Sequence, residues 1–101
     1  HIMDLADGHI AALEYLNQNS EINIFENINL GTGVGYSVME IINVFSEIIG
    51  KEIEYEFLGR REGDAPISYA DTRKAKEILN WRANRDLYAM LNDAWKFYKD
   101  A

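Results

Sequence analysis

The residues best suited to chemistry in this sequence of 101 residues lie in one short segment, Arg60–Pro66. It carries two adjacent arginines, a glycine and, three residues after Arg61, the carboxylate of Asp64. A guanidinium can bind a phosphate group through two parallel hydrogen bonds, and a carboxylate can accept hydrogen bonds from a pair of ribose hydroxyls. The segment therefore suits a nucleotide, although ion pairs between its arginines and its acids, Glu62 and Asp64, explain the same residues without a ligand.

A glycine-rich segment, Gly31–Ser37, follows a predicted strand and opens a predicted helix, which is the usual setting for a phosphate at a helix N-terminus. The dinucleotide-binding pattern G-x-G-x-x-G would need glycine at position 36, where this sequence has Tyr36. The segment is also too short for a P-loop and lacks its lysine. We therefore interpret the glycines as forming a tight strand-to-helix turn, and predict no cofactor-binding residue here.

The two histidines, His1 and His9, lie near Asp4 and Asp7, but no third strong metal ligand is fixed in register with them. We expect Asp4 to cap a helix N-terminus, and His9 to be packed and hydrogen-bonded on the apolar side of that helix. No serine or threonine has a base partner, and the sequence has no cysteine. The sequence therefore predicts no metal site and no catalytic residue in this chain.

The composition fits one net-acidic globular domain. The chain is 48% hydrophobic and 27% charged, with a formal net charge of −7. That charge argues against a nucleic-acid or membrane-surface binder, and no apolar run reaches the ~20 residues that span a bilayer. The lack of cysteine suits a cytoplasmic protein. The window 60–85 nevertheless carries +3, which leaves −10 elsewhere, so an anion site and a solvated face of ion pairs both remain open for this window.

Four helices are predicted to position these residues. Apolar residues recur at helical spacing in each of them, and each begins at a residue that can cap a helix N-terminus. Ser37 and Glu40 have the spacing of a capping box, and Gly50 ends the helix that they open. The predicted helices start at Asp4, Ser37, Asp71 and Asp86, and the first three end near Asn17, Gly50 and Leu79.

Alternating apolar residues predict the strands. Residues 22–30 alternate, most clearly from Phe25 to Leu30, and residues 51–57 place three apolar residues on one face and three glutamates on the other. A strand, helix, strand order implies a parallel pair with a right-handed crossover, and the stretch 68–70 adds a short strand. The predicted fold class is α+β, with two parallel strands plus a short strand and about four helices.

Four motifs occur in the order in which a known family has them. They are His1–His9, the loop from Asn29 to Val38, Arg61-Glu62-Gly63-Asp64-x-Pro66 with Ala70-Asp71-x-x-Lys74-Ala75, and the turn Leu79-Asn80-Trp81. With these motifs the chain resembles, over residues 1–101, the C-terminal part of the UDP-glucose 4-epimerase family within the extended short-chain dehydrogenases/reductases. Related nucleotide-sugar enzymes share part of the Arg61–Asp64 motif.

The resemblance implies that Arg61 contacts the diphosphate of a UDP-sugar substrate and that Asp64 contacts its uridine ribose. It also implies that Ser68 lines the sugar pocket, since a bulky tyrosine at this position restricts the pocket in that family. A small residue there is associated with N-acetylated sugars. We therefore expect the parent enzyme to interconvert UDP-GlcNAc and UDP-GalNAc as well as UDP-glucose and UDP-galactose, through a 4-keto intermediate formed with tightly bound NAD.

The glycine-rich turn that binds NAD in the family, and its catalytic Tyr-x-x-x-Lys motif, are both absent from this sequence. The sequence also starts partway into a family motif, so we expect a fragment that lacks the N-terminal Rossmann domain and is inactive alone. Apolar surface left by the missing domain should drive self-association. Two alternatives stay open. One is the same portion of a UDP-glucuronate epimerase or decarboxylase or a dTDP-glucose dehydratase; the other is a non-catalytic module that binds a nucleotide or a protein.

Overall fold

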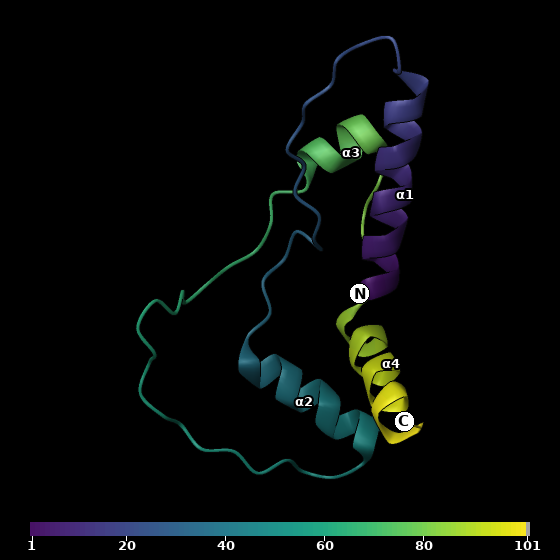
Figure 1. Ribbon diagram of the computed structural model, residues 1–101. Helices are drawn as coiled ribbons and strands as arrows, with labels where there is room; N and C mark the ends of the chain where they lie inside the picture. The colour runs from purple at the N-terminus through teal and green to yellow at the C-terminus, as the bar shows by residue number, and fades with distance from the viewer. Residues whose placement is uncertain (101) are drawn as a thin grey trace. The chain divides into compact units, whose positions relative to one another are not determined.

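The computed structural model describes residues 1–100, which form four α-helices joined by irregular segments (Figure 1). The helices are α1 (Ile2–Gln18), α2 (Val38–Ile49), α3 (Arg73–Leu79) and α4 (Leu87–Asp100). The chain divides into two compact units, each assembled from two stretches of the sequence. Unit 1 comprises His1–Val34 and Tyr69–Asp86, and unit 2 comprises Gly35–Ser68 and Leu87–Ala101.

Unit 1 is built on the contact between α1 and α3, beside the buried side chain of Trp81. The indole Nε1 of Trp81 donates a hydrogen bond to the backbone carbonyl of Asp4 at 3.0 Å, and Ala75 of α3 is completely buried. At Gly8 the helix α1 comes so close to its neighbours that a Cβ atom would lie 2.6 Å from Leu30 Cδ1. The small residues Gly8 and Ala75 therefore allow the close packing of this unit.

The carboxylate of Asp4 is buried in unit 1 and joins α1 to the segment before α4. Its Oδ1 accepts a hydrogen bond from Arg85 Nη1 at 2.6 Å, and its Oδ2 accepts from the backbone N–H groups of Asn84 and Arg85 at 3.2 and 3.0 Å. The Asp4 side chain is only 3% exposed, whereas that of Arg85 is 36% exposed. A buried carboxylate is compatible with folding here because both of its oxygens are hydrogen-bonded.

The prediction that Asp4 caps the first helix was wrong. The helix α1 begins two residues earlier, at Ile2, because the ring nitrogen Nδ1 of His1 accepts a hydrogen bond from the N–H of Met3 and takes the capping role. His9 is hydrogen-bonded as predicted, since its Nδ1 lies 2.8 Å from the carbonyl oxygen of Leu5, but its side chain is exposed rather than packed.

The helix α3 ends at Leu79 as predicted, and begins at Arg73 with Thr72 as its N-cap residue. Asp71, predicted to be the cap, lies one residue earlier and accepts hydrogen bonds from the backbone N–H and the guanidinium of Arg73. The side-chain hydrogen bond from Arg73 lowers the pKa of Asp71 to about 2. Both side chains are exposed, so this pair adds little to the stability of the unit.

Unit 2 is held together by the packing of α2 against α4, in which an aromatic cluster takes part. The ring of Phe45 meets that of Trp95 edge to face, with centroids 5.6 Å apart, and Trp95 stacks on Tyr98 at 5.8 Å. Aromatic pairs of this kind contribute about 0.5–1.5 kcal/mol beyond the area that they bury. These contacts explain why the apolar faces of α2 and α4 pack against each other.

The boundaries of α2 are those predicted from the sequence. The Oγ of Ser37 accepts from the N–H of Glu40 at 3.0 Å, and the Glu40 carboxylate accepts from the N–H of Ser37 at 3.3 Å, which completes the capping box. At the other end Gly50 adopts a left-handed conformation with φ +74° and ends the helix. Both signals act within one turn of the helix and need no tertiary partner.

The α+β prediction was wrong, because residues 1–100 contain four helices and no strand. Residues 22–30, 51–57 and 68–70, which were predicted to be strands, are irregular chain segments (Figure 1). A strand requires a ladder of backbone hydrogen bonds to a neighbour, and none of these segments forms one. The alternation of apolar residues indicates that a segment has one apolar and one polar face, but it does not show that another strand lies beside the segment to pair with it.

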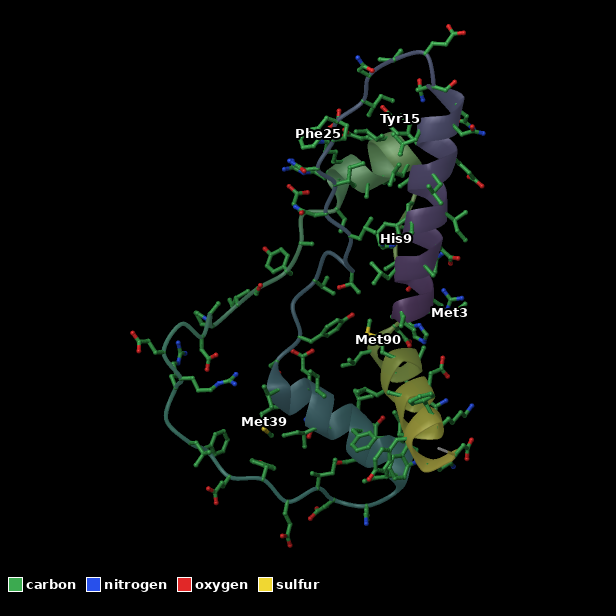
Figure 2. The ribbon with its side chains drawn as sticks, viewed as in Figure 1. Met3, His9, Tyr15, Phe25, Met39 and Met90 are labelled. Carbon is green, nitrogen blue, oxygen red and sulfur yellow. The ribbon has the colours of Figure 1, made fainter. Side chains whose placement is uncertain are left out.

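Much of the apolar surface of the helices is not covered within the described chain. Among residues 1–100 the only hydrophobic residues that are buried are Ala75 and Trp81. Phe25, on the segment after α1, is 90% exposed (Figure 2). Six large apolar residues of α1 are exposed, namely Ile2, Met3, Leu5, Ile10, Leu13 and Leu16. No described helix has a stretch long and apolar enough to cross a bilayer.

Candidate functional site

The segment Arg61–Asp64 forms a turn in unit 2 that is closed by hydrogen bonds in both directions. The N–H of Asp64 donates to the carbonyl of Arg61 at 3.2 Å, and the N–H of Arg61 donates to Oδ2 of Asp64, also at 3.2 Å. Gly63 occupies the third position with φ +84°, a conformation that favours glycine over residues with a side chain. The turn thus places the arginine and the carboxylate side by side.

The side chains of Arg61 and Asp64 form an ion pair that leaves most of their hydrogen-bonding groups unused. Nε of Arg61 lies 3.2 Å from Oδ2 of Asp64, and the two side chains are 87% and 39% exposed. Within residues 1–100, no hydrogen bond engages the two Nη atoms of Arg61 or Oδ1 of Asp64. These are the groups that a phosphate and a ribose hydroxyl would need as donors and as an acceptor.

Ser68, the third predicted site residue, lines a hollow of about 570 Å³ in unit 2. Two chain segments form this hollow, residues 35–38 at the start of α2 and residues 65–68, with Glu40 beside them. Its volume lies in the range of about 300–1,000 Å³ that is typical of pockets for small molecules. Side chains of both polarities face it, so it suits an organic ligand with hydroxyl groups better than a purely apolar one.

Only two of the three predicted site residues contact each other in the structure. Arg61 and Asp64 contact each other, but neither is among the residues that line the hollow at Ser68. The N-terminus of α2 also borders this hollow, and its capping box places the carboxylate of Glu40 there. A negative charge in the first turn opposes phosphate binding at this helix end. Of the predicted residues, Arg61 is therefore the one whose unused donors suit a phosphate.

Two glycines of the glycine-rich segment, Gly31 and Gly33, serve packing within unit 1. A Cβ atom on Gly31 would lie 2.9 Å from the Cβ of Ala70, and one on Gly33 would lie 3.3 Å from Oγ1 of Thr72. Gly33 also has φ +82°, which residues with side chains rarely adopt. The space beside these glycines is occupied by the protein itself, so the segment does not fit the pyrophosphate of a dinucleotide such as NAD.

Sequence reasoning missed the part of the hollow that residues 35–38 supply. It interpreted residues 31–37 as a strand-to-helix turn with Ser37 as the helix cap, and it did not predict that Tyr36 and Val38, which flank this cap, border the same hollow as Ser68. The signal present in the sequence was an aromatic and a branched apolar residue on either side of a capping serine. It missed also the pair of Asp4 and Arg85, which are 81 residues apart in the sequence.

Comparison with known proteins relates nearly the whole chain to one group of enzymes. It is 47%, 43% and 42% identical to the UDP-glucose 4-epimerases of Yersinia pestis, Bacillus subtilis and Homo sapiens, over 95, 97 and 99 residues. These alignments cover 94%, 96% and 98% of this chain, but only 27%, 28% and 28% of the relatives. No protein-family model matches the chain.

The same relationship holds among solved structures. The crystal structure of UDP-glucose 4-epimerase from Bifidobacterium longum in complex with NAD⁺ and UDP matches 99% of this chain with a TM-score of 0.85 and 34% identity. This chain covers 29% of that protein. In both comparisons the chain spans a little over a quarter of the length of the proteins that it resembles.

Proposed function

We propose that this chain, which is similar along nearly all its length to the C-terminal portion of UDP-glucose 4-epimerases, is the UDP-sugar-binding portion of such an enzyme. The observation that carries the proposal is the turn Arg61–Asp64, which presents unused guanidinium donors and an unused carboxylate oxygen on adjacent side chains. The parent enzyme then interconverts UDP-glucose and UDP-galactose.

In this function Arg61 binds the diphosphate and Asp64 binds the uridine ribose. The two Nη atoms of Arg61 can donate to phosphate oxygens in the bidentate geometry that guanidinium groups favour. Oδ1 of Asp64 can accept from a ribose hydroxyl while Oδ2 keeps its hydrogen bond to the backbone N–H of Arg61. The turn itself therefore needs no rearrangement to hold both groups of the nucleotide.

NAD belongs to the remainder of the parent enzyme in this proposal. The residues described here do not fit a dinucleotide, because Ala70 and Thr72 fill the space beside Gly31 and Gly33. The relative whose crystal structure resembles this chain was solved with NAD⁺ and UDP. The redox step thus falls outside the chemistry of this chain, which contributes substrate binding and is inactive alone.

Binding of UDP to the 101-residue chain tests the roles of Arg61 and Asp64. Titration followed by calorimetry should give weak, saturable binding, because the chain supplies only part of the pocket. Arg61→Ala and Asp64→Asn should each weaken it about tenfold, the effect of losing one charge-assisted hydrogen bond. Lys51→Ala, which removes a positive charge elsewhere in unit 2, is the matched control. Unchanged affinity in both site variants would contradict the proposal.

The hollow at Ser68 is the part of the site that sets sugar preference in our proposal. A serine leaves room that a bulky side chain would fill, and the hollow of about 570 Å³ beside it supports acceptance of N-acetylated sugars. In the full-length parent enzyme, Ser68→Tyr should abolish turnover of UDP-GlcNAc and UDP-GalNAc while preserving that of UDP-glucose and UDP-galactose. Undetectable turnover of the N-acetylated pair by the unmodified enzyme would refute this assignment.

The exposed apolar side of α1 is where we propose that the remainder of the parent enzyme packs. Six large apolar residues of this helix are exposed although α1 is firmly held in unit 1 by Asp4 and Gly8. A surface of this kind marks an interface with other polypeptide. When the chain is isolated, the same surface drives self-association.

A further inference from the structure

Unit 1 contains a hollow whose chemistry differs from that of the hollow at Ser68. It has a volume of about 410 Å³ and is formed by the last turn of α3 and the segment that follows that helix. Its lining residues are Lys76, Asn80, Trp81, Arg82 and Asn84. Two of them are cationic, two carry amides and none is acidic, although the chain as a whole has a net charge of −7.

The two cations of this hollow are the ones in unit 1 that the protein does not neutralise. Unit 1 holds five lysine and arginine residues. Three of them form ion pairs, namely Arg73 with Asp71, Lys74 with Glu26, and Arg85 with Asp4 and Asp7. Lys76 and Arg82 form no ion pair within residues 1–100, and both line the same hollow. Two cationic residues without an ion pair therefore border one hollow.

The backbone that carries these side chains is fixed by the fold. The N–H groups of Asn80 and Trp81 donate to the carbonyls of Lys76 and Ala75 at 3.1 and 3.3 Å, which closes the end of α3. Asn80 is held in a left-handed conformation with φ +51°. The indole of Trp81 is anchored by its hydrogen bond to the carbonyl of Asp4, and the side chain is 7% exposed. The polar groups therefore project from a preorganised frame.

From these features we propose that the hollow in unit 1 binds a phosphate group. Lys76 and Arg82 neutralise the two charges of a phosphate dianion, and the side-chain NH₂ groups of Asn80 and Asn84 donate to its oxygens. The volume of about 410 Å³ exceeds what a phosphate ion alone requires, so the hollow also accommodates the organic part of a small phosphate monoester. The site does not depend on the proposed UDP-sugar function, because Arg61 and Asp64 belong to unit 2.

Titration of the 101-residue chain with inorganic phosphate at constant ionic strength tests this site. Nuclear magnetic resonance follows the indole N–H of Trp81 and the side-chain amides of Asn80 and Asn84. We expect saturable shifts of these signals, and the double variant Lys76→Ala/Arg82→Ala should weaken binding more than about tenfold. The double variant Lys96→Ala/Lys99→Ala is the matched control, since it removes two cations of α4 that have no ion pair in the described chain.

Three results of this titration would contradict a phosphate site in unit 1. Shifts that do not saturate, that sodium chloride reproduces, or that both double variants weaken equally would overturn the proposal. Lys76 and Arg82 are exposed, and an unchanged circular dichroism spectrum verifies that their variants remain folded. Arg61→Ala must leave the phosphate shifts at Trp81 intact, because a loss would assign them to the UDP site. Tighter binding of a sugar monophosphate identifies a monoester as the ligand, and equal binding identifies free phosphate.

Discussion

At the scale of single residues, the carboxyl group of Asp4 shows how unit 1 stabilises a buried charge. Burial alone would raise the pKa of Asp4, but hydrogen bonds from Arg85 and Asn84, together with the charge of Arg85, lower it below its usual value of 3.8. A carboxyl whose pKa is lowered by folding stabilises the folded state above pH 3.8. That stabilisation is lost as the pH falls through the lowered pKa.

We predict that Asp4→Asn lowers the free energy of unfolding at pH 7 by about 2–3 kcal/mol, because it removes the charged acceptor of three hydrogen bonds and leaves Arg85 without its buried partner. Urea unfolding followed by circular dichroism measures this loss. The difference from the unmodified chain should shrink as the pH falls below 3.8. Asp71→Asn is the control and should have little effect, since its carboxylate is exposed. Equal losses in both variants would contradict this account.

Gly31 offers a second prediction for a single residue. Its missing side chain allows contact with Ala70, whose Cβ belongs to a short side chain and cannot move without the backbone. Gly31→Ala should therefore destabilise unit 1 by about 1–3 kcal/mol, the usual effect of overpacking. Gly59→Ala is the matched control, because no atom lies within 4 Å of the position that its Cβ would take. Thermal unfolding that leaves the two variants equally stable would refute the packing role of Gly31.

At the scale of elements, the sequence predicts helices better than strands for a physical reason. The start and end of α2 depend on Ser37, Glu40 and Gly50, which act through hydrogen bonds and backbone angles inside the helix itself. The strands predicted at 22–30 and 51–57 depend on neighbours that the described chain does not place beside them. In the second segment Tyr55 and Phe57 still share one side, with ring centroids 5.6 Å apart. The alternation was therefore correct as a description of faces and wrong as a prediction of a sheet.

The capping box of α2 gives a prediction at this scale. Ser37→Ala should lower the free energy of unfolding by about 1 kcal/mol, because the N–H of Glu40 loses its hydrogen-bond acceptor. Glu40→Gln should have a much smaller effect, since the amide oxygen can still accept from the N–H of Ser37. Urea unfolding of the two variants compares these effects. A larger loss for Glu40→Gln than for Ser37→Ala would show that charge, rather than the capping hydrogen bonds, dominates at this helix end.

Amide hydrogen exchange distinguishes irregular segments from strands in the isolated chain. Residues 51–57 have no ladder of backbone hydrogen bonds, so their amides should exchange at rates close to those of an unfolded peptide. The amides in the middle of α2 should exchange at least about tenfold more slowly, because each is hydrogen-bonded within the helix. Protection of alternate amides across 51–57 would contradict this expectation.

At the scale of the whole molecule, the predictable part of the candidate site is the part that is local. Arg61 and Asp64 are three residues apart, and the turn around Gly63 is enough to bring them together. The contribution of residues 35–38 to the hollow at Ser68 is not local, since 26 residues separate it from the segment 65–68 and only the fold joins the two. The residues that line the hollow in unit 1 are close together in the sequence, but long-range ion pairs elsewhere decide which cations of the unit remain unpaired.

Many large apolar side chains of both units are exposed to solvent in the described chain. Three of the exposed residues of α1, Ile10, Leu13 and Leu16, are each three positions apart, so they line one side of the helix. Burial of one such side chain contributes roughly 1.5–3 kcal/mol. A contact that buries several of them on each of two chains would offset the entropy lost on association. The isolated chain is therefore expected to associate with itself at concentrations used for structural work.

Sedimentation velocity across a hundredfold range of concentration measures this self-association. The weight-average sedimentation coefficient should rise with concentration, and Leu13→Gln should shift the midpoint at least about tenfold upward, because it removes an apolar side chain that is 66% exposed. Glu14→Gln is the matched control, since it places the same new side chain on the adjacent exposed position of α1 without removing an apolar group. A monomer with no dependence on concentration would contradict the prediction. Equal association of both variants would show that the contact between chains does not involve Leu13 of α1. That result would not bear on the binding of UDP at Arg61 and Asp64.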